Sequence, residues 1–468
     1  MDTTPQPIRV TAELLDLLRR YDRPGPRYTS YPTAVEFHEG VNGAAYEAKL
    51  AEADAVPGDP LSLYFHLPFC RKRCAFCGCS VIITRKPEVV GRYLEYLRRE
   101  IDLVAARLPQ RRTVNQVHWG GGTPTHLDSA ALSTLWADIN RRFQLAPGAE
   151  VAIEVDPRVT THEQIDTLRA LGFNRLSMGV QDFTPAVQEA IGRHQGVEES
   201  VDLFNYGRSA GFDSINVDQV YGLPRQTPES FRRNLDQLIA LRPDRVAVYS
   251  FAFVPWVKAN QRRLDPASFP SPELKFELLL NAVAAFTAAG YVQIGMDHFA
   301  LPSDELAVAQ RAGRLHRNFM GYTVMPATDQ IGFGITSIGD LRGAFVQNVK
   351  KLAGYYDALE AGRLPVERGY LLDGDDKIRR QVILQLMCNF SLDTATIEER
   401  FGIRFVEYFA AELEELKTSE ESGFVRLSPG RIEVTGRGRL FIRNVCMTFD
   451  RYLRVKRAGD EQVFSRTV

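Results

Sequence analysis

The chain has 468 residues, of which 44% are hydrophobic and 25% are charged, an ordinary composition for a globular protein of two or three domains. Lysine and arginine number 57 against 58 aspartate and glutamate, which excludes a general attraction to nucleic acid or acidic membranes. No apolar run approaches the ~20 residues of a transmembrane helix, and residues 1–7 lack the apolar stretch of a signal peptide. We therefore expect a cytoplasmic protein with no membrane or nucleic-acid partner.

The middle of the chain repeats one order of elements, a strand followed by a helix. A short β-rich run at 61–66 precedes a helical pattern at 87–107. The order then recurs with strands at 114–119, 151–155, 174–179, 214–220 and 245–251, and with helices at 129–143, 161–171, up to about 210, 228–241 and 271–289. Serial units of this kind predict a parallel α/β sheet. Six units are too few for a closed eight-unit barrel, so an open or partial barrel fits better.

The two ends of the chain differ from this middle part. Helical patterns at 373–388, 394–418 and 436–449, with a hairpin at 424–435, predict a small, mostly helical, winged-helix-like C-terminal domain. It has no basic excess, so a lid or packing module is favoured over DNA binding. Residues 27–34 read as a surface arm, or as an arm whose two tyrosines cap a pocket. The expected divisions are an N-terminal arm at 1–55, the barrel at 56–300, a barrel extension and linker at 301–370, and the C-terminal domain at 371–468.

Four cysteines follow the first predicted strand within ten residues: Cys70, Cys74, Cys77 and Cys79. Thiolates this close hold an iron–sulfur cluster or zinc more often than they pack a core. Three thiolates at x3 and x2 spacing would leave one iron of a four-iron cluster open to a small ligand, which favours an enzyme. Structural zinc, a cluster that also uses Cys79, and a disulfide framework are the alternatives.

Other unusual residues also follow strand ends, where the carboxyl ends of parallel strands form one rim. A glycine turn at 120–122 can approach a ligand with its backbone. Glu154 could pair with a cationic group of a cofactor. Arg193 could bind a carboxylate and Asp218 a ribose. Each of these residues alone has an ordinary interpretation, since acidic residues before helices are usually caps and Arg193 could be a solvated helix residue.

Several motifs resemble a known family. The spacing Cys70-x3-Cys74-x2-Cys77, with Phe76 before the last cysteine, is similar to the signature of radical S-adenosylmethionine enzymes. Longer motifs narrow the resemblance, among them R-Y-T-S-Y-P-T-A, H-W-G-G-G-T-P-T, E-V-D-P-R, F-N-R-L-S-M-G-V-Q-D-F, Y-G-L-P-x-Q-T-P-E-S-F, L-H-R-N-F-x-G-Y-T and R-N-V-C-M-T-F-D. Together they resemble the oxygen-independent coproporphyrinogen III oxidases, from about residue 20 to the final F-S-R.

The resemblance implies both a fold and a reaction. The family fold is a partial (β/α)6 barrel with N- and C-terminal additions. A [4Fe-4S] cluster bound by Cys70, Cys74 and Cys77 cleaves S-adenosylmethionine to a 5′-deoxyadenosyl radical, which takes hydrogen from a propionate β-carbon. Loss of CO2 and one electron leaves a vinyl group, and two such conversions turn coproporphyrinogen III into protoporphyrinogen IX in anaerobic heme biosynthesis. An electron donor such as flavodoxin or ferredoxin and a monomeric state are also implied.

The resemblance further assigns site residues. It implies two S-adenosylmethionine sites, the first contacted by Tyr64, Gly121 and Glu154. The second would be contacted by Phe76, Gly122, Thr123, Gln181, Arg193, Asp218, Ala252 and Ile338. Cys79, His66 and Tyr64 are candidates for a role in catalysis, Cys79 without ligating the cluster; His66 could instead be a packed strand histidine.

The sequence departs from the family pattern at 192–195, 251–255 and 332–343. These departures leave open a paralogue that acts on another tetrapyrrole. Two further alternatives are a heme chaperone of the related family and a radical methyltransferase that acts on heme. Such chaperones generally lack both the cysteine matching Cys79 and the arm at 27–34, so the oxidase is favoured.

Overall fold

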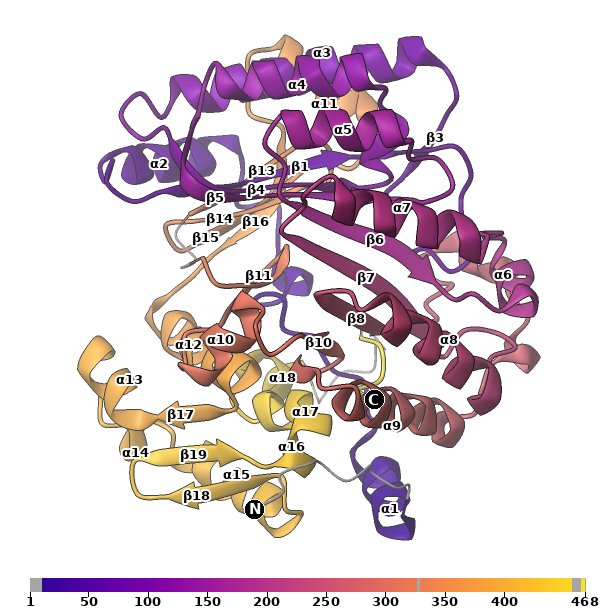
Figure 1. Cartoon of the computed structure of the whole chain (residues 1–468). Helices are drawn as coiled ribbons and strands as arrows, with labels where there is room; N and C mark the ends of the chain where they lie inside the picture. The colour runs from indigo at the N-terminus through magenta and orange to yellow at the C-terminus, as the bar shows by residue number, and fades with distance from the viewer. Residues whose placement is uncertain (1–10, 326–328, 457–463, 468) are drawn as a thin grey trace.

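A curved sheet of twelve strands forms the centre of the molecule (Figure 1). The computed structural model describes residues 11–325, 329–456 and 464–467, so residues 1–7, on which the absence of a signal peptide was predicted, lie outside it. The strand order is β16-β15-β14-β13-β1-β4-β5-β6-β7-β8-β10-β9. Within the described residues, no helix is both long enough and apolar enough to cross a membrane.

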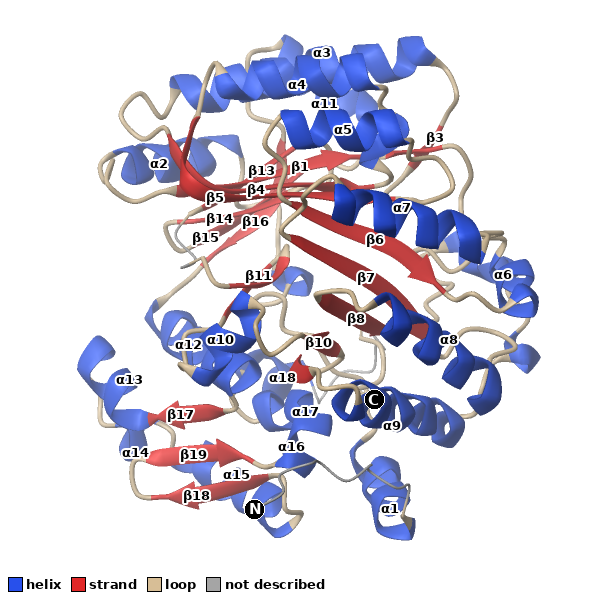
Figure 2. Cartoon of the chain, in the orientation of Figure 1, coloured by secondary structure: helices blue, strands red, loops and turns tan. Residues whose placement is uncertain are grey.

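Six consecutive strands of this sheet are parallel. They are β1 (Leu61–Leu67), β4 (Thr113–Gly121), β5 (Gln144–Val155), β6 (Arg175–Gln181), β7 (Ser214–Tyr221) and β8 (Arg245–Ser250). The connecting helices are α3 (Pro87–Ala106), α4 (Ser129–Asn140), α5 (His162–Ala170), α6 (Pro185–Ile191), α7 (Val197–Ser209), α8 (Pro228–Leu241) and, after β8, α9 (Pro272–Ala288). These helices cover one face of the sheet (Figure 2). The six predicted units and the predicted partial barrel are therefore confirmed.

The main core lies between this sheet and its covering helices. Phe65 on β1 stacks on Phe333 with ring centroids 4.8 Å apart, and Trp119 on β4 meets Phe173 edge-on at 5.0 Å. All four side chains are at most 1% exposed, and each fully buried aromatic side chain stabilises the fold by about 2 kcal/mol. Polar caps start the helices: Thr161 and Gln164 form a capping box at α5. The buried apolar strands and the polar helix caps thus explain why the sequence predicts alternating strands and helices.

Both edges of the sheet extend beyond the six predicted strands. At one edge β13 (Gln330–Phe333) runs parallel to β1, and β14 (Ile338–Leu341), β15 (Ala344–Asn348) and β16 (Val366–Leu371) continue antiparallel. At the other edge β10 (His298–Ala300) and β9 (Val292–Gly295) are antiparallel. The remaining elements of this region are α10 (Glu305–Arg311), β11 (His316–Asn318), β12 (Gly321–Thr323) and α11 (Leu352–Glu360).

The C-terminal part is mostly helical and carries the predicted hairpin, β18 (Val425–Ser428) with β19 (Arg431–Val434). The prediction of a two-stranded wing was incomplete, because β17 (Ser391–Asp393) pairs with β19 as a third strand. The single helix expected at 394–418 is also broken: Gly402 adopts φ +65° and ends the first segment. The helices are α12 (Gly374–Asn389), α13 (Thr394–Phe401), α14 (Phe405–Tyr408), α15 (Ala410–Glu421), α16 (Gly436–Leu440), α17 (Ile442–Met447) and α18 (Arg451–Lys456).

The N-terminal segment comprises α1 (Ala12–Tyr21), the turn η1 (Ala34–Glu36) and α2 (Gly43–Asp54). The tyrosines of the arm at 27–34 are buried, each 1% exposed. Tyr28 donates a hydrogen bond of 2.9 Å to Asp450, and the Tyr31 hydroxyl accepts one from the Arg451 amide. The arm is therefore packed against the C-terminal part, so the interpretation as an exposed surface arm was wrong, whereas the capping of a pocket by its tyrosines stays a prediction.

Candidate active site

The cysteines lie on a loop that leaves the carboxyl end of β1. Two short parallel strands, β2 (Phe69–Cys70) and β3 (Ile82–Ile83), close the base of this loop. The amide of Thr123 donates to the Phe69 carbonyl at 2.8 Å, and the Thr123 hydroxyl lies 3.5 Å from the Cys70 sulfur. The loop base is therefore attached to the glycine turn that follows β4.

Residues distant in sequence hold the outer part of the cysteine loop. The side-chain amide of Asn260, in the turn η3 (Ala259–Arg263), donates to the carbonyls of Cys74, Ala75 and Cys77 at 3.0–3.2 Å. The neighbouring Gln261 donates to the Phe76 carbonyl at 3.0 Å. These bonds fix the backbone of the loop and involve none of its thiols.

The glycine turn meets Glu154, which stands near the end of β5. The Gly121 amide donates to Glu154 at 3.0 Å, and His118 Nε2 lies 3.5 Å from the other carboxylate oxygen. Burial opposes ionisation, but the hydrogen bonds from His118 and Gly121 outweigh it and lower the pKa of Glu154. A Cβ at Gly120 would lie 2.9 Å from this carboxylate, so a side chain there would displace Glu154.

Tyr64 and His66, both on β1, form a layer behind the glycine turn. His66 Nε2 lies 2.9 Å from the Ser80 carbonyl, so this nitrogen carries the proton and Nδ1 accepts from the Tyr64 hydroxyl at 3.1 Å. Burial lowers the pKa of His66 and keeps the imidazole neutral. The Tyr64 ring stacks on His118 with centroids 6.0 Å apart. These side chains brace the turn and Glu154 from behind.

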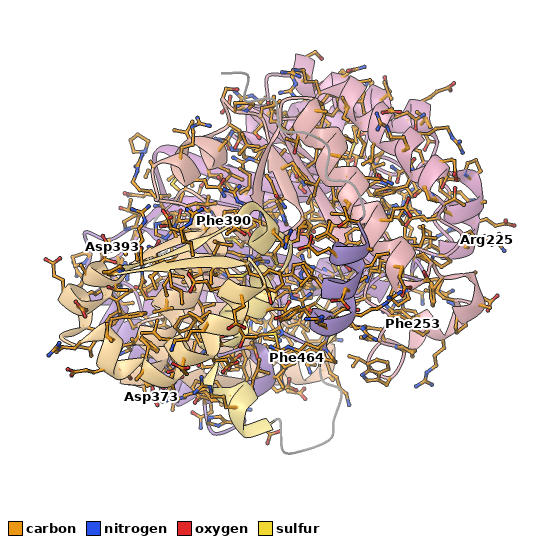
Figure 3. The ribbon with its side chains drawn as sticks, turned by 90° about the horizontal axis from the view of Figure 1, so that it is seen from below. Arg225, Phe253, Asp373, Phe390, Asp393 and Phe464 are labelled. Carbon is orange, nitrogen blue, oxygen red and sulfur yellow. The ribbon has the colours of Figure 1, made fainter. Side chains whose placement is uncertain are left out.

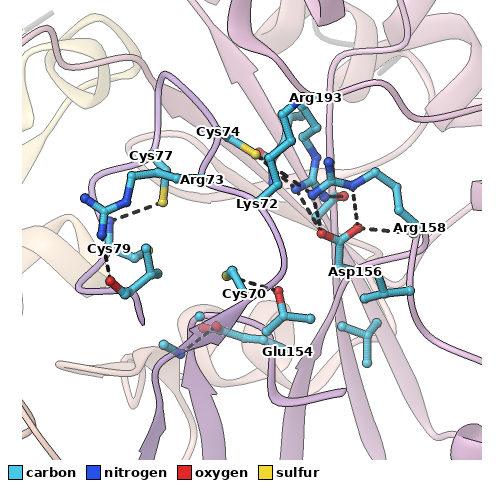
Figure 4. Close-up of a pocket in the computed structure, with 18 of the residues that line it drawn as sticks. Cys70, Lys72, Arg73, Cys74, Cys77, Cys79, Glu154, Asp156, Arg158 and Arg193 are labelled. Carbon is cyan, nitrogen blue, oxygen red and sulfur yellow. Dashed lines mark hydrogen bonds and ion pairs between the residues drawn. The ribbon is translucent and has the colours of Figure 1, made fainter. Parts of the chain in front are cut away.

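Asp156, just after β5, holds two arginines next to Cys74 (Figure 4). Arg193 donates to Asp156 at 3.1 Å and Arg158 at 2.6 Å, and each guanidinium lies 3.9 Å from the Cys74 sulfur. Burial alone would raise the pKa of Asp156, but Arg193 and Arg158 outweigh it and lower the pKa. Arg193 is therefore not the solvated helix residue considered from the sequence; it is 7% exposed and also donates to the Gly179 carbonyl at 2.7 Å.

Asp218, on β7, stands apart from these charge pairs. Burial raises its pKa to about 7, although Asn216 donates a hydrogen bond of 2.8 Å; the charge of Glu154 acts in the same direction as burial. The group can therefore donate as well as accept hydrogen bonds near neutral pH. Gln181 ends β6 with φ +70°, a left-handed conformation that is uncommon outside glycine.

One cavity of about 410 Å³ joins these groups at the carboxyl ends of the strands. The residues named from the sequence that line it are Cys70, Cys74, Phe76, Cys77, Cys79, Gly121, Gly122, Thr123, Glu154, Gln181, Arg193 and Asp218. Most of the expected rim therefore gathers around a single space, as the strand order predicts.

Four residues named from the sequence lie outside this lining. Tyr64 and His66 stand in the layer behind the turn. Ala252 lies in the segment after β8, where its carbonyl accepts from Gln261 at 3.1 Å. Ile338, on β14, packs beside a cluster of Phe37, Phe345 and Leu372. The assignment of Ala252 and Ile338 to a cofactor site stays a prediction, because neither residue lines the cavity.

Sequence reasoning also missed residues that the structure brings to the site. Arg158 follows the motif residues Glu154 and Asp156; the sequence placed both carboxylates on the rim but assigned a role to Glu154 alone. Tyr249, near the end of β8, lines the cavity. Its position at a strand end was the available signal. Asn260 had no local signal at all, because it acts on a loop that lies far away in the sequence.

The donor set fits an iron–sulfur cluster. All six cysteines are unpaired, and Cys70, Cys74 and Cys77 surround the cavity together. Hydrogen bonding with Cys79 lowers the pKa of Cys77 to about 6, whereas burial raises that of Cys70 to about 11. The described residues contain no group of three or more His, Cys, Asp or Glu side chains gathered closely enough for a single metal ion.

Comparisons with known proteins agree with this geometry. The Radical SAM superfamily model matches residues 64–238, and the HemN C-terminal domain model matches residues 372–441. The oxygen-independent coproporphyrinogen III oxidase of Salmonella typhimurium (strain LT2) is 47% identical over 97% of this chain and 98% of its own; that of Synechocystis is 43% identical over the whole of both chains. The solved structure of coproporphyrinogen III oxidase (HemN) from Escherichia coli, described as a radical SAM enzyme, superposes with a TM-score of 0.89 at 45% identity, covering 96% of this chain and 100% of that one. The chain therefore belongs to the oxygen-independent coproporphyrinogen III oxidases of the radical SAM superfamily.

Proposed function

We propose that this chain converts two propionate side chains of coproporphyrinogen III into vinyl groups without oxygen, giving protoporphyrinogen IX in heme biosynthesis. The observation that carries the proposal is the cavity at the carboxyl ends of the barrel strands, where three thiols face Glu154, Asp218 and Arg193. Each propionate loses one hydrogen atom, one CO2 and one electron, and this balance defines an oxidative decarboxylation.

The residues present fit the cofactors that the family uses. Three thiols at the mouth of a fixed loop suit a [4Fe-4S] cluster with one iron open. When bound, the cluster and S-adenosylmethionine supply the electron and the adenosyl radical that removes the substrate hydrogen. Glu154 stays ionised and suits an amino group, while the glycine turn exposes its backbone to a carboxylate. Tyr64 and His66 are hydrogen-bonded to each other behind this turn, and His66 lies against Gly121.

We also propose that the cavity binds a second S-adenosylmethionine. Phe76, Gly122, Thr123 and Gln181 line the same cavity as Arg193 and Asp218. The Arg193 guanidinium suits a carboxylate, and Asp218, which can donate or accept, suits a ribose hydroxyl. We further infer that the enzyme acts as a cytoplasmic monomer that takes electrons from flavodoxin or ferredoxin.

Anaerobic turnover tests this function. The protein, reconstituted with iron and sulfide, would receive S-adenosylmethionine, a reductant and coproporphyrinogen III, and 5′-deoxyadenosine and protoporphyrin would be measured together. We expect two 5′-deoxyadenosine per protoporphyrin. Cys74→Ala should lose the cluster absorbance and both products, whereas Cys79→Ser should keep the cluster and lose protoporphyrin. Deoxyadenosine without protoporphyrin in the wild type would point to another tetrapyrrole, and tight heme binding with neither product would point to a chaperone.

A further inference from the structure

Positive charge is concentrated around the cysteine loop. Residues 68–86, which form the loop and its base, contain five basic side chains and no acidic one. Residues 251–264, which hold the loop from outside, contain three basic side chains and no acidic one; Asp265 follows directly. The whole chain has a net charge of −1, so this excess is local. It would attract an acidic partner to one side of the molecule.

Two large apolar side chains stand exposed in the second of these segments. Trp256 is 53% exposed and Val257 64%, whereas the other two tryptophans, Trp119 and Trp136, are buried. Phe253 of the same segment lies across the molecule from Phe390 and Asp393 of the C-terminal part (Figure 3). An exposed tryptophan contributes little to folding, while tryptophan and arginine are enriched where proteins bind one another. The pattern is typical of a protein-binding surface.

The segment that carries these exposed side chains is hydrogen-bonded to the backbone of the cysteine loop. Asn260 donates to the carbonyls of Cys74 and Cys77, and Arg263 donates to the Arg73 carbonyl at 3.2 Å. Lys72 and Arg73 lie on the cysteine loop itself (Figure 4). The segment that carries Trp256 is therefore bonded directly to the backbone of the cysteine loop.

We propose that Trp256, Val257 and Arg262 form a docking surface for an acidic one-electron carrier protein. The proposal rests on the proposed function, because it requires a cluster that is reduced. For each S-adenosylmethionine cleaved, the carrier is oxidised by one electron, and that electron breaks the carbon–sulfur bond. The anionic substrate would also be attracted by these cations, but the exposed Trp256 and Val257 favour a protein.

Binding of a purified acidic flavodoxin to the reconstituted enzyme tests this surface. Calorimetry would give the affinity of the wild type and its decline with salt. The variant Trp256→Ala/Arg262→Glu should bind about tenfold more weakly, with a smaller salt dependence. Arg263 stays unchanged because it holds the cysteine loop. The matched control is Val406→Ala/Arg314→Glu, with the same charge change: Val406 is 64% exposed in the C-terminal part, and Arg314 is an exposed residue that follows α10.

Turnover separates this proposal from the proposed function. With dithionite as reductant, both variants should form 5′-deoxyadenosine at the wild-type rate. With flavodoxin as reductant, only Trp256→Ala/Arg262→Glu should be slower, by about tenfold. Unchanged flavodoxin affinity in this variant would overturn the docking surface, as would a raised KM for coproporphyrinogen III with unchanged flavodoxin binding. If the wild type showed no turnover with dithionite, the proposed function would be contradicted instead. The calorimetry would still show whether flavodoxin binds at this surface.

Discussion

Arg193 donates a hydrogen bond of 3.1 Å to Asp156, and this pair joins the end of β5 to the segment between α6 and α7, next to Cys74. Both side chains are almost completely buried. A buried guanidinium is tolerated only where its charge is compensated, and Asp156 compensates Arg158 as well. One carboxylate thus fixes two cations on the cavity wall.

Replacing this carboxylate should destabilise the protein. Asp156→Asn leaves Arg193 and Arg158 without their counterion, and we expect the free energy of unfolding to fall by about 3 kcal/mol. Chemical denaturation of the cluster-free protein measures this change. Asp202→Asn is the control, because Asp202 pairs with His162 at the surface and such pairs contribute little. An equal effect of both substitutions would contradict the role assigned to Asp156.

Gly122 should tolerate no side chain. A Cβ there would lie 2.6 Å from the Pro68 carbonyl carbon and 2.7 Å from the Phe69 carbonyl oxygen, which is backbone that cannot rotate away. We expect Gly122→Ala to destabilise the protein by about 1–3 kcal/mol and to reduce cluster incorporation. Gly91→Ala is the matched control within α3: a Cβ there meets nothing within 4 Å, and the change should stabilise by roughly 0.5–1 kcal/mol. Thermal unfolding and iron content report both variants.

Asp218 should make stability depend on pH. Its pKa is raised to about 7 from an ordinary 3.8, so the folded protein binds a proton that the unfolded chain releases. The stability that this proton contributes is complete below about pH 4 and is lost as pH rises through 7. The wild type should therefore lose stability as the pH rises from 5 to 8, whereas Asp218→Asn should not. Relative to the wild type, the variant should be more stable at pH 8 than it is at pH 5. Melting temperatures of the cluster-free proteins at both values test this, and a constant difference would show that Asp218 titrates normally.

The six parallel strands were predictable because strand and helix patterns are local and periodic. The strands β9 to β14 have three or four residues each, too few to show a period, and they were missed. The edge strands β15 and β16, of five and six residues, were missed as well. The third wing strand, β17, is three residues long and was missed for the same reason. The break after α13 rests on one glycine with a left-handed backbone, which sequence reasoning passed over.

The rim residues were predictable because the carboxyl ends of parallel strands converge. Contacts between distant segments could not be predicted from the sequence. Tyr28 and Tyr31 look like surface residues of an arm until the C-terminal part covers them. Asn260 carries no motif, and its bond to the Cys74 carbonyl spans 186 residues. Such contacts follow from the folded topology and have no local sequence pattern.

Asn260 should control how firmly the cluster is held. Its side chain donates to three carbonyls of the cysteine loop, and Asn260→Ala leaves these groups to move. Losing about 1.5 kcal/mol of hydrogen bonding should accelerate iron release by about tenfold. Chelation of iron from the reconstituted enzyme, followed by absorbance, measures this rate. Asn140→Ala, at the exposed end of α4, is the control. Equal release rates in the two variants would mean that the thiols alone retain the cluster, and that the segment after β8 acts only as the surface on which a partner docks.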